Sequence, residues 1–269
     1  MENIKEYTAR KKAELKKYID GLEKKPKLVI IQVGNVEASN RYVKNKLKDC
    51  AECSLPAELL HYDETVTEEE LLNKINELNN DAAVTGFICQ LPLPKHISED
   101  KVIEAINPLK DVDGFSKLAI TTPATPTGAI DFLDEQGFEY KDKNAVVLGR
   151  SHILGAPLSQ MLLAKNCNVT TLHSKTSEDN KKFYIENADL ICACVGKRHL
   201  INASYRLKPT CVILDFGINF NDEGKLCGDC DKDLPVAFQS PVPGGLGLCT
   251  RLALITNLVK LYKIQNKVS

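Results

Sequence analysis

Tyr42 and Lys46 lie four residues apart in the segment VGNVEASNRYVKNKLKDC. On a helix, this spacing places the phenol and the ammonium group on one face, a single turn apart. A partly buried lysine loses hydration that stabilises its charge, so its pKa falls and its amine can act as an acid or base. The pair therefore predicts proton-transfer chemistry. The competing interpretation is a solvated helix face, because Lys44, Lys46 and Lys48 form a basic run.

The segments around this pair predict how it is positioned. The run KLVIIQV before it is almost continuously apolar, which is typical of a buried strand, and Gly34 ends it. Residues 38–48 then fit a helix. Open α/β folds bind ligands beyond the carboxyl ends of their strands. We therefore expect the tyrosine and the lysine to lie at a binding site.

Three further segments carry polar groups or glycines at turns. GFICQLPLPKHI places Gln90 at the end of another buried strand, because Pro92 prevents the strand from continuing. NPLKDVDGF places Asp113 in a turn. A loop near the C-terminus lets backbone come close to a ligand; it contains Pro243, Gly244 and Gly245. Each segment alone is also typical of a plain turn.

The second half of the chain contains a pattern for binding a nucleotide. KNAVVLGRSHILGAPLSQMLLAKN predicts a strand, a glycine turn and a helix, with Gly149 and Gly155 in the turn. Glycines let backbone amides approach a pyrophosphate, and a helix N-terminus favours its negative charge. The glycine spacing is not the common GxGxxG, so a βαβ crossover that binds no phosphate is the competing interpretation.

The next predicted strand indicates which nucleotide binds. It ends in His173, Ser174, Lys175 and Thr176, without the acid that usually holds the ribose of NAD. Arg150 projects from the glycine turn. A hydroxyl and two cations suit a 2′-phosphate, so the sequence favours NADP over NAD.

Length and composition limit the number of domains and the class of protein. A chain of 269 residues with 43% hydrophobic residues can form one large domain or two. Strand-like and helix-like segments alternate, which favours α/β architecture with parallel sheets. Residues 121–128 are rich in Pro and Thr, as a hinge between domains would be.

The net charge of −1 gives no electrostatic reason to expect binding to nucleic acid or to an anionic membrane. No apolar run is long enough to span a bilayer, and the first residues lack a signal-peptide pattern.

The ten cysteines predict reduced thiols rather than a disulfide framework. Several lie in apolar strand-like runs, where cysteine acts as a small hydrophobic residue. This use of cysteine favours a cytoplasmic protein. Two CxxC pairs, Cys50/Cys53 and Cys227/Cys230, could together supply four zinc ligands. We expect no metal, because the first pair falls at a helix end and the pairs lie far apart in the sequence.

Taken in order, the segments resemble one family. The series ASxxYxxxK, QLPLP, KDVDG, TPxG, VVLGRSxxxGxP, VTxxHSKT, VGK, DFGIN, GD and PVPGG is similar to that of the bifunctional methylenetetrahydrofolate dehydrogenase/cyclohydrolases. The resemblance spans about residues 33–257. Short-chain dehydrogenases also contain YxxxK, but there it follows the nucleotide glycines, whereas here it precedes them by about a hundred residues.

The resemblance implies a fold and a set of site residues. The fold would comprise two α/β domains around a cleft. Residues 1–120 plus 243–269 would form a catalytic folate-binding domain, and residues 121–242 a Rossmann-like NADP-binding domain with a parallel sheet. Lys46 would be the central catalytic residue, in contact with Tyr42 and Gln90. Folate would be bound by Asp113, Pro243, Gly244 and Gly245. NADP would be bound by Gly149, Arg150, Ser151, Gly155, Ser174 and Ile218.

The activity implied by the resemblance belongs to one-carbon metabolism. The enzyme would oxidise 5,10-methylenetetrahydrofolate with NADP⁺ and hydrolyse the methenyl product to 10-formyltetrahydrofolate, a product connected with purine biosynthesis. Homodimers are usual in this family. This chain departs from the pattern between Phe115 and Thr122, where relatives usually carry about a dozen more residues. Two alternatives stay open. One is a monofunctional NAD(P)-dependent dehydrogenase, against which the retained Lys46 argues. The other is a non-catalytic folate- or nucleotide-binding protein, which the short segment suggests.

Overall fold

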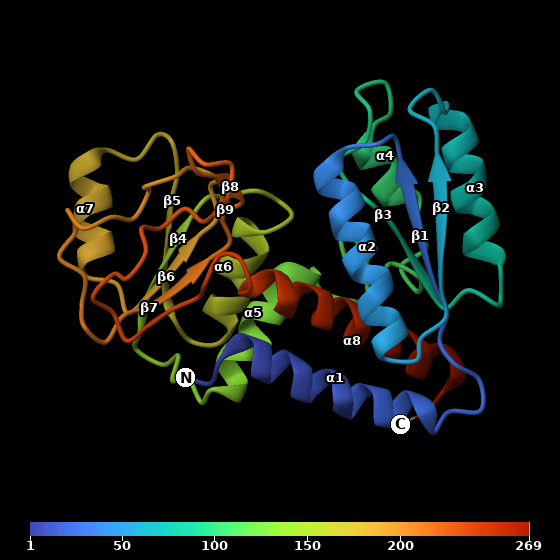
Figure 1. Ribbon diagram of the computed structural model, residues 1–269, viewed down its shortest axis with the longest axis horizontal. Coiled ribbons are helices and arrows are strands. Elements are labelled where there is room, and N and C mark those ends of the chain that lie inside the picture. Colours follow the sequence, from blue (N-terminus) through green and yellow to red (C-terminus); the bar gives the residue numbers. More distant parts are fainter. Residues whose placement is uncertain (269) are drawn as a thin grey trace. The chain divides into compact units, whose positions relative to one another are not determined.

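The computed structural model describes residues 1–268 and shows an α/β protein that divides into two compact units (Figure 1). The three-stranded unit comprises Ala9–Ala124 and the chain from Arg251 onward, and the five-stranded unit comprises Met1–Thr8 and Thr125–Thr250. Residues 1–8 and 243–250 thus belong to the five-stranded unit, whereas the predicted domain boundaries grouped them with the other part of the chain. One reason is that Tyr7 packs edge-on against Phe132, with 5.3 Å between the ring centroids.

The three-stranded unit is built on a parallel sheet with strand order β2-β1-β3. Its strands are β1 (Leu28–Val33), β2 (Ala57–Tyr62) and β3 (Gly86–Cys89). Its helices are α2 (Glu37–Glu52), α3 (Glu68–Asn80) and α4 (Glu99–Ala105), together with most of α1 (Ile4–Asp20) and most of α8 (Leu246–Asn266).

Both faces of this sheet are covered. Every residue of β1 is buried, which explains its nearly continuous apolar sequence. Alternate side chains point to opposite faces of a strand. Ile30 therefore packs in one cluster with residues of α1, α2 and α8, and Ile31 packs in another with residues of α3 and α4. Figure 1 shows α2 and α3 flanking the strands of this unit.

Local sequence explains where two of these helices begin. Thr67 and Glu70 form a capping box at the start of α3, in which each side chain satisfies the other's backbone amide. Ser98 precedes α4 and accepts a hydrogen bond from the backbone N–H of Lys101. Serine is a common residue at this position because its hydroxyl satisfies a backbone amide that has no partner inside the helix.

The five-stranded unit contains a parallel sheet with strand order β10-β7-β6-β4-β5. These strands are β4 (Asn144–Leu148), β5 (Asn168–Leu172), β6 (Leu190–Ala193), β7 (Val212–Asp215) and β10 (Phe238–Gln239). A separate antiparallel pair is formed by β8 (Asn219–Phe220) and β9 (Leu226–Cys227). The helices are α5 (Ala124–Glu135), α6 (Gly155–Ala164) and α7 (Glu178–Glu186).

Central β4 has β5 on one side and β6 on the other, and α6 connects β4 to β5. This arrangement is that of a doubly wound nucleotide-binding sheet, in which ligands bind beyond the carboxyl ends of the strands. The predicted α/β class with parallel sheets is confirmed. No helix among residues 1–268 has the length and apolarity needed to cross a bilayer.

The starts of α8 and α5 are less evident in the sequence than those of α3 and α4. Thr250 is a residue type common before a helix, but α8 begins at Leu246 and the Thr250 hydroxyl donates a hydrogen bond to the Leu246 carbonyl inside the helix. Gly247 looks like a loop residue in the sequence, yet one glycine in the first turn of a well-packed helix costs only about 1 kcal/mol. Helix α5 begins at Ala124, within the segment 121–128 that the sequence indicates as a hinge.

Candidate active site

Helix α2 carries Tyr42 and Lys46 at the place that the sequence predicts, just after β1. Gly34 makes the turn between these elements with a φ of 71°, a conformation that favours glycine. Lys46 is only 5% exposed, whereas Lys44 and Lys48 on the same helix are exposed. The solvated-face interpretation is therefore wrong for Lys46 and correct for its two neighbours in the basic run.

The Lys46 amine has two polar partners from other segments of the three-stranded unit. Its Nζ donates a hydrogen bond to Gln90 Oε1 at 3.1 Å and lies 4.0 Å from Asp113 Oδ1. Gln90 directly follows β3, and its own Nε2 donates to the Leu91 carbonyl at 2.8 Å, which fixes the amide with its oxygen toward the lysine. Three residues singled out by the sequence thus meet at one point.

Asp113 is held by the backbone around it. The carboxylate of Asp111 accepts hydrogen bonds from the backbone N–H groups of Gly114 at 2.8 Å and Ser116 at 2.9 Å. Asn257 of α8 donates to the carbonyls of Val112 and Thr122. The turn that carries Asp113 is therefore fixed from both sides.

Burial is the largest influence on the pKa values of Lys46, Asp113 and Tyr42. It lowers the pKa of Lys46 and raises the pKa of Asp113, because desolvation disfavours the charged form of each. The attraction between the two groups opposes both shifts. Burial also raises the pKa of the Tyr42 phenol. The amine at Nζ is thus more easily deprotonated than an ordinary lysine, which is what a general base requires.

One contributor to this site is not evident in the sequence. Asp49, buried on α2, accepts a hydrogen bond from Lys12 at 2.8 Å and forms an ion pair with Arg251 of α8. The positive charge of Arg251 adds to the lowering of the Lys46 pKa and opposes the rise in the Tyr42 pKa. The only sequence signal is that Asp49 lies one helical turn after Lys46; nothing in the sequence connects it with Arg251.

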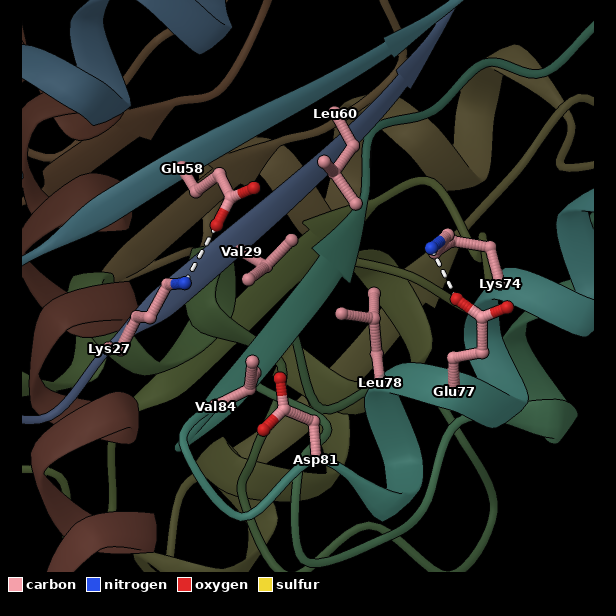
Figure 2. A pocket seen from close by; sticks show the side chains of 9 residues that line it. All are labelled: Lys27, Val29, Glu58, Leu60, Lys74, Glu77, Leu78, Asp81 and Val84. Atoms are coloured by element: carbon pink, nitrogen blue, oxygen red, sulfur yellow. Dashed lines mark hydrogen bonds and ion pairs between the residues drawn. The ribbon is translucent and has the colours of Figure 1, made fainter.

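The hollow in Figure 2 is a different place from this group. Its lining includes Lys27 and Val84, which lie at the amino ends of β1 and β3, whereas Gln90 follows the carboxyl end of β3. A Lys27–Glu58 ion pair of 2.7 Å and a Lys74–Glu77 pair border an apolar floor. No residue predicted for catalysis lines the hollow.

The predicted nucleotide residues lie at the carboxyl ends of β4 and β5 in the five-stranded unit. Gly149 has a φ of 113°, and a Cβ on Gly155 would lie 2.3 Å from the Gly149 carbonyl oxygen, so both positions need glycine. The residue before α6, Leu154, has no capping side chain, and the Gly155 amide donates a hydrogen bond to Ser151 Oγ at 3.5 Å. Arg150, Ser151 and Ser174 are exposed at this edge. These features fit a dinucleotide, because they combine close backbone approach, a helix N-terminus and a cation.

The remaining predicted residues also lie in the five-stranded unit. Ile218 follows β7 with an exposed side chain. Pro243, Gly244 and Gly245 form the loop before α8, where Gly244 has a φ of 91° and a Cβ on Gly245 would lie 2.1 Å from the Pro241 carbonyl oxygen. The compactness of this loop depends on its glycines.

The ten cysteines are all free, and most are buried. Burial raises the pKa of Cys50 to about 12 and that of Cys53 to about 11, so neither thiol is readily ionised. Within residues 1–268, no three or more His, Cys, Asp or Glu side chains are grouped so as to hold a metal ion.

Comparison with known proteins identifies the family. The catalytic-domain model of the tetrahydrofolate dehydrogenase/cyclohydrolase family matches residues 2–113, and the NAD(P)-binding-domain model of the same family matches residues 123–266. The chain belongs to this family.

Relatives and solved structures agree with this family. The chain is 43% identical to the bifunctional protein FolD of Agathobacter rectalis over 267 residues, covering 94% of this chain and 95% of that one. Identity to FolD of Paracidovorax citrulli is 45% over 247 residues, covering 87% and 86%. The crystal structure of the Campylobacter jejuni enzyme FolD, a methylenetetrahydrofolate dehydrogenase/cyclohydrolase, superposes with a TM-score of 0.92 at 36% identity, covering 98% of each chain. The Trypanosoma brucei enzyme, solved with NADP cofactor and inhibitor, gives 0.93 at 26% identity, covering 100% of this chain and 98% of that one.

Proposed function

We propose that this protein oxidises 5,10-methylenetetrahydrofolate with NADP⁺ and then hydrolyses 5,10-methenyltetrahydrofolate to 10-formyltetrahydrofolate. The observation that carries the proposal is the buried Lys46 amine, hydrogen-bonded to Gln90 and 4.0 Å from Asp113, in a chain that also has a doubly wound nucleotide sheet. Membership of the dehydrogenase/cyclohydrolase family supports both activities.

The hydrolysis step uses the lysine as a base. A neutral Lys46 Nζ takes a proton from the water that adds to the methenyl carbon, and Gln90 Oε1 holds the amine in place by accepting its N–H. The protonated Lys46 amine then returns this proton to the ring nitrogen, and the bond between that nitrogen and the one-carbon group breaks. The hydroxyl of the water adduct releases its proton to solvent, which leaves the formyl group on the other nitrogen. A lowered lysine pKa suits a cationic substrate, because a charged ammonium would repel it.

The remaining predicted residues bind and orient. Asp113 lies beside Lys46, where its carboxyl group accepts hydrogen bonds from the N–H groups of the pterin. The Pro243–Gly245 loop contacts one side of the folate. NADP⁺, when bound, supplies the acceptor for the hydride that leaves the one-carbon bridge. Such a transfer needs orientation rather than a strong acid or base.

The cofactor proposal rests on the exposed side chains at the ends of β4 and β5. Gly149 and Gly155 let the pyrophosphate approach the N-terminus of α6. Arg150, Ser151 and Ser174 would hold the 2′-phosphate of the adenosine ribose, and Ile218 would contact the opposite half of the cofactor.

One absorbance experiment tests the whole proposal. Purified protein is mixed with 5,10-methylenetetrahydrofolate and NADP⁺, and NADPH, the methenyl compound and its decay are followed together. Formation of NADPH with catalysed decay supports both activities. NADPH formation without catalysed decay would point to a monofunctional dehydrogenase, and the absence of both signals to a binding protein.

We propose that the protein works as a homodimer in the cytoplasm and that its product serves purine biosynthesis. Strand β2 is an edge strand, paired only with β1, and Leu59 on it is exposed. The adjoining hollow carries both lysines and carboxylates, so two copies related by a twofold axis can place opposite charges together. Free thiols suit a reducing compartment. Sedimentation equilibrium of wild type and Leu59→Lys tests the assembly, and a monomeric wild type would contradict it.

A further inference from the structure

Asp229 is fully buried beside the loop that follows β6. Its Oδ2 accepts hydrogen bonds from the backbone N–H groups of Val195 at 2.8 Å and Gly196 at 3.0 Å. Its Oδ1 accepts from the N–H of Lys197 at 2.8 Å and from Asn219 Nδ2 at 2.8 Å. Three successive backbone amides directed at one point can bind an anion. Here the anion is the carboxylate of Asp229 itself.

A second buried carboxylate holds Asp229 in place. Asp215, the last residue of β7, accepts hydrogen bonds from the backbone N–H groups of Asp229 and Cys230, both at 2.9 Å, and from that of Gly217 at 2.8 Å. A Cβ on Gly217 would lie 2.3 Å from Asp229 Oδ1, so there is no space for a larger group or a water. The two carboxylates thus join the loops after β6 and β7.

These loops lie where one half of a dinucleotide binds. A doubly wound sheet binds its cofactor across the carboxyl ends of the strands. In the proposed function, the β4–α6–β5 portion takes the adenosine half, so the nicotinamide half extends over β6 and β7, on the other side of β4. Val195 and Ile218, from the two loops, are 49% and 60% exposed there and offer apolar surface to a ring.

We infer that Asp229 is a positioning residue for the nicotinamide end of NADP⁺, an assignment that rests on the proposed function. It touches no cofactor atom itself. It fixes Val195–Lys197 through their amides, and it fixes the loop after β7 through Asn219. Because a buried carboxylate with four donors has one low-energy arrangement, the surface offered to the ring is ordered before the cofactor arrives.

The test compares Asp229→Asn with the matched control Asp222→Asn. The control makes the same chemical change at a side chain that is 92% exposed and paired with Arg198, next to the same loop. Binding of NADP⁺ and of adenosine 2′,5′-bisphosphate, which lacks the nicotinamide half, is measured by calorimetry. For Asp229→Asn we expect the NADP⁺ Kd to rise on the order of tenfold, since a charge-assisted hydrogen bond is lost. The bisphosphate Kd and the cyclohydrolase rate measured without cofactor should stay as in wild type.

The control should match wild type in every measurement. Equal NADP⁺ affinity in wild type and a folded Asp229→Asn would overturn the inference, as would equal losses for both ligands. A wild type that binds no NADP⁺ would instead refute the proposed function, and the inference with it.

A second variant decides the matter if Asp229→Asn does not fold. Gly196 has a φ of 74° and open space around it, so Gly196→Val strains the loop from outside without touching the buried carboxylates. We expect the same selective loss of NADP⁺ over the bisphosphate. Unchanged NADP⁺ binding by this variant would show that the loop does not position the nicotinamide end.

Discussion

Replacing Lys46 by methionine isolates the chemical role of the amine. Methionine keeps much of the apolar stem, so the packing of α2 should survive. The change removes the donor to Gln90 Oε1, which costs about 1–3 kcal/mol if that oxygen stays unpaired. It also removes the desolvation cost of a buried lysine, so the two effects oppose each other and the melting temperature should change little.

The effect on hydrolysis should be much larger. Loss of a positioned proton-transfer group lowers a rate by roughly 10²–10⁴-fold. We expect at least a 10²-fold slower decay of the methenyl compound for Lys46→Met, measured by absorbance. Lys44→Met, which changes an exposed lysine of the same helix, should hydrolyse at the wild-type rate. Oxidation of methylenetetrahydrofolate should be less affected than hydrolysis, because hydride transfer needs no base at this position.

The pH profile of hydrolysis provides an independent check. Because burial lowers the pKa of Lys46, its neutral amine becomes populated at a pH below the ordinary value of 10.5. The rate should therefore rise with pH through a limb that lies below that value and that disappears in Lys46→Met. Wild-type hydrolysis by the methionine variant, or an unchanged pH limb, would refute the role given to this lysine.

Three other predictions concern the cofactor, metal and folate. Arg150→Ala should weaken NADP⁺ by about 1.5–3 kcal/mol through loss of a charge-assisted hydrogen bond and leave NAD⁺ nearly unchanged; titration with both cofactors decides, and equal losses would remove the 2′-phosphate assignment. Elemental analysis of protein purified without chelator should find no stoichiometric zinc, and a full equivalent would point first to Cys227 and Cys230. Replacing Phe115–Thr122 with the longer family segment should lower the folate KM without changing NADP⁺ affinity, because the short segment leaves the folate tail less enclosed; tight folate binding or no turnover in the wild type would contradict this.

The sequence predicts the framework of this protein well. The sequence predicts strands at residues 57–62, 144–148 and 168–172, and these ranges agree with β2, β4 and β5 at both ends. Each is a short run with β-branched or apolar residues between polar or glycine breaks, so local preference and burial indicate the same element. The strands β8, β9 and β10 were not predicted, because two-residue strands carry no periodicity. Helix α7 was also missed, although Ser177 caps it and Glu178 and Asp179 follow in its first turn.

Parts of the candidate sites could not be predicted, for physical reasons. Lys46 lies in a basic run, and only the fold shows that this one lysine is buried while its neighbours are exposed. The pairing of Asp49 with Arg251 joins side chains 202 residues apart. Asp229 binds backbone amides, which every residue has, so no side-chain pattern marks its partners.

The bonds around Asp111 have a consequence for how this chain tolerates changes of length. Its carboxylate accepts hydrogen bonds from the backbone N–H groups of Gly114 and Ser116. The position of Asp113 is therefore fixed by residues at the start of the short segment Phe115–Thr122. The Thr121 hydroxyl donates a hydrogen bond to the Asp111 carbonyl, which anchors the other end of this segment. The residues between these two anchored points form a loop whose ends are fixed. Each doubling of the length of such a loop costs only about 0.6 kcal/mol of conformational entropy. The segment is thus a place beside the candidate site where residues can be inserted while Asp113 keeps its position next to Lys46.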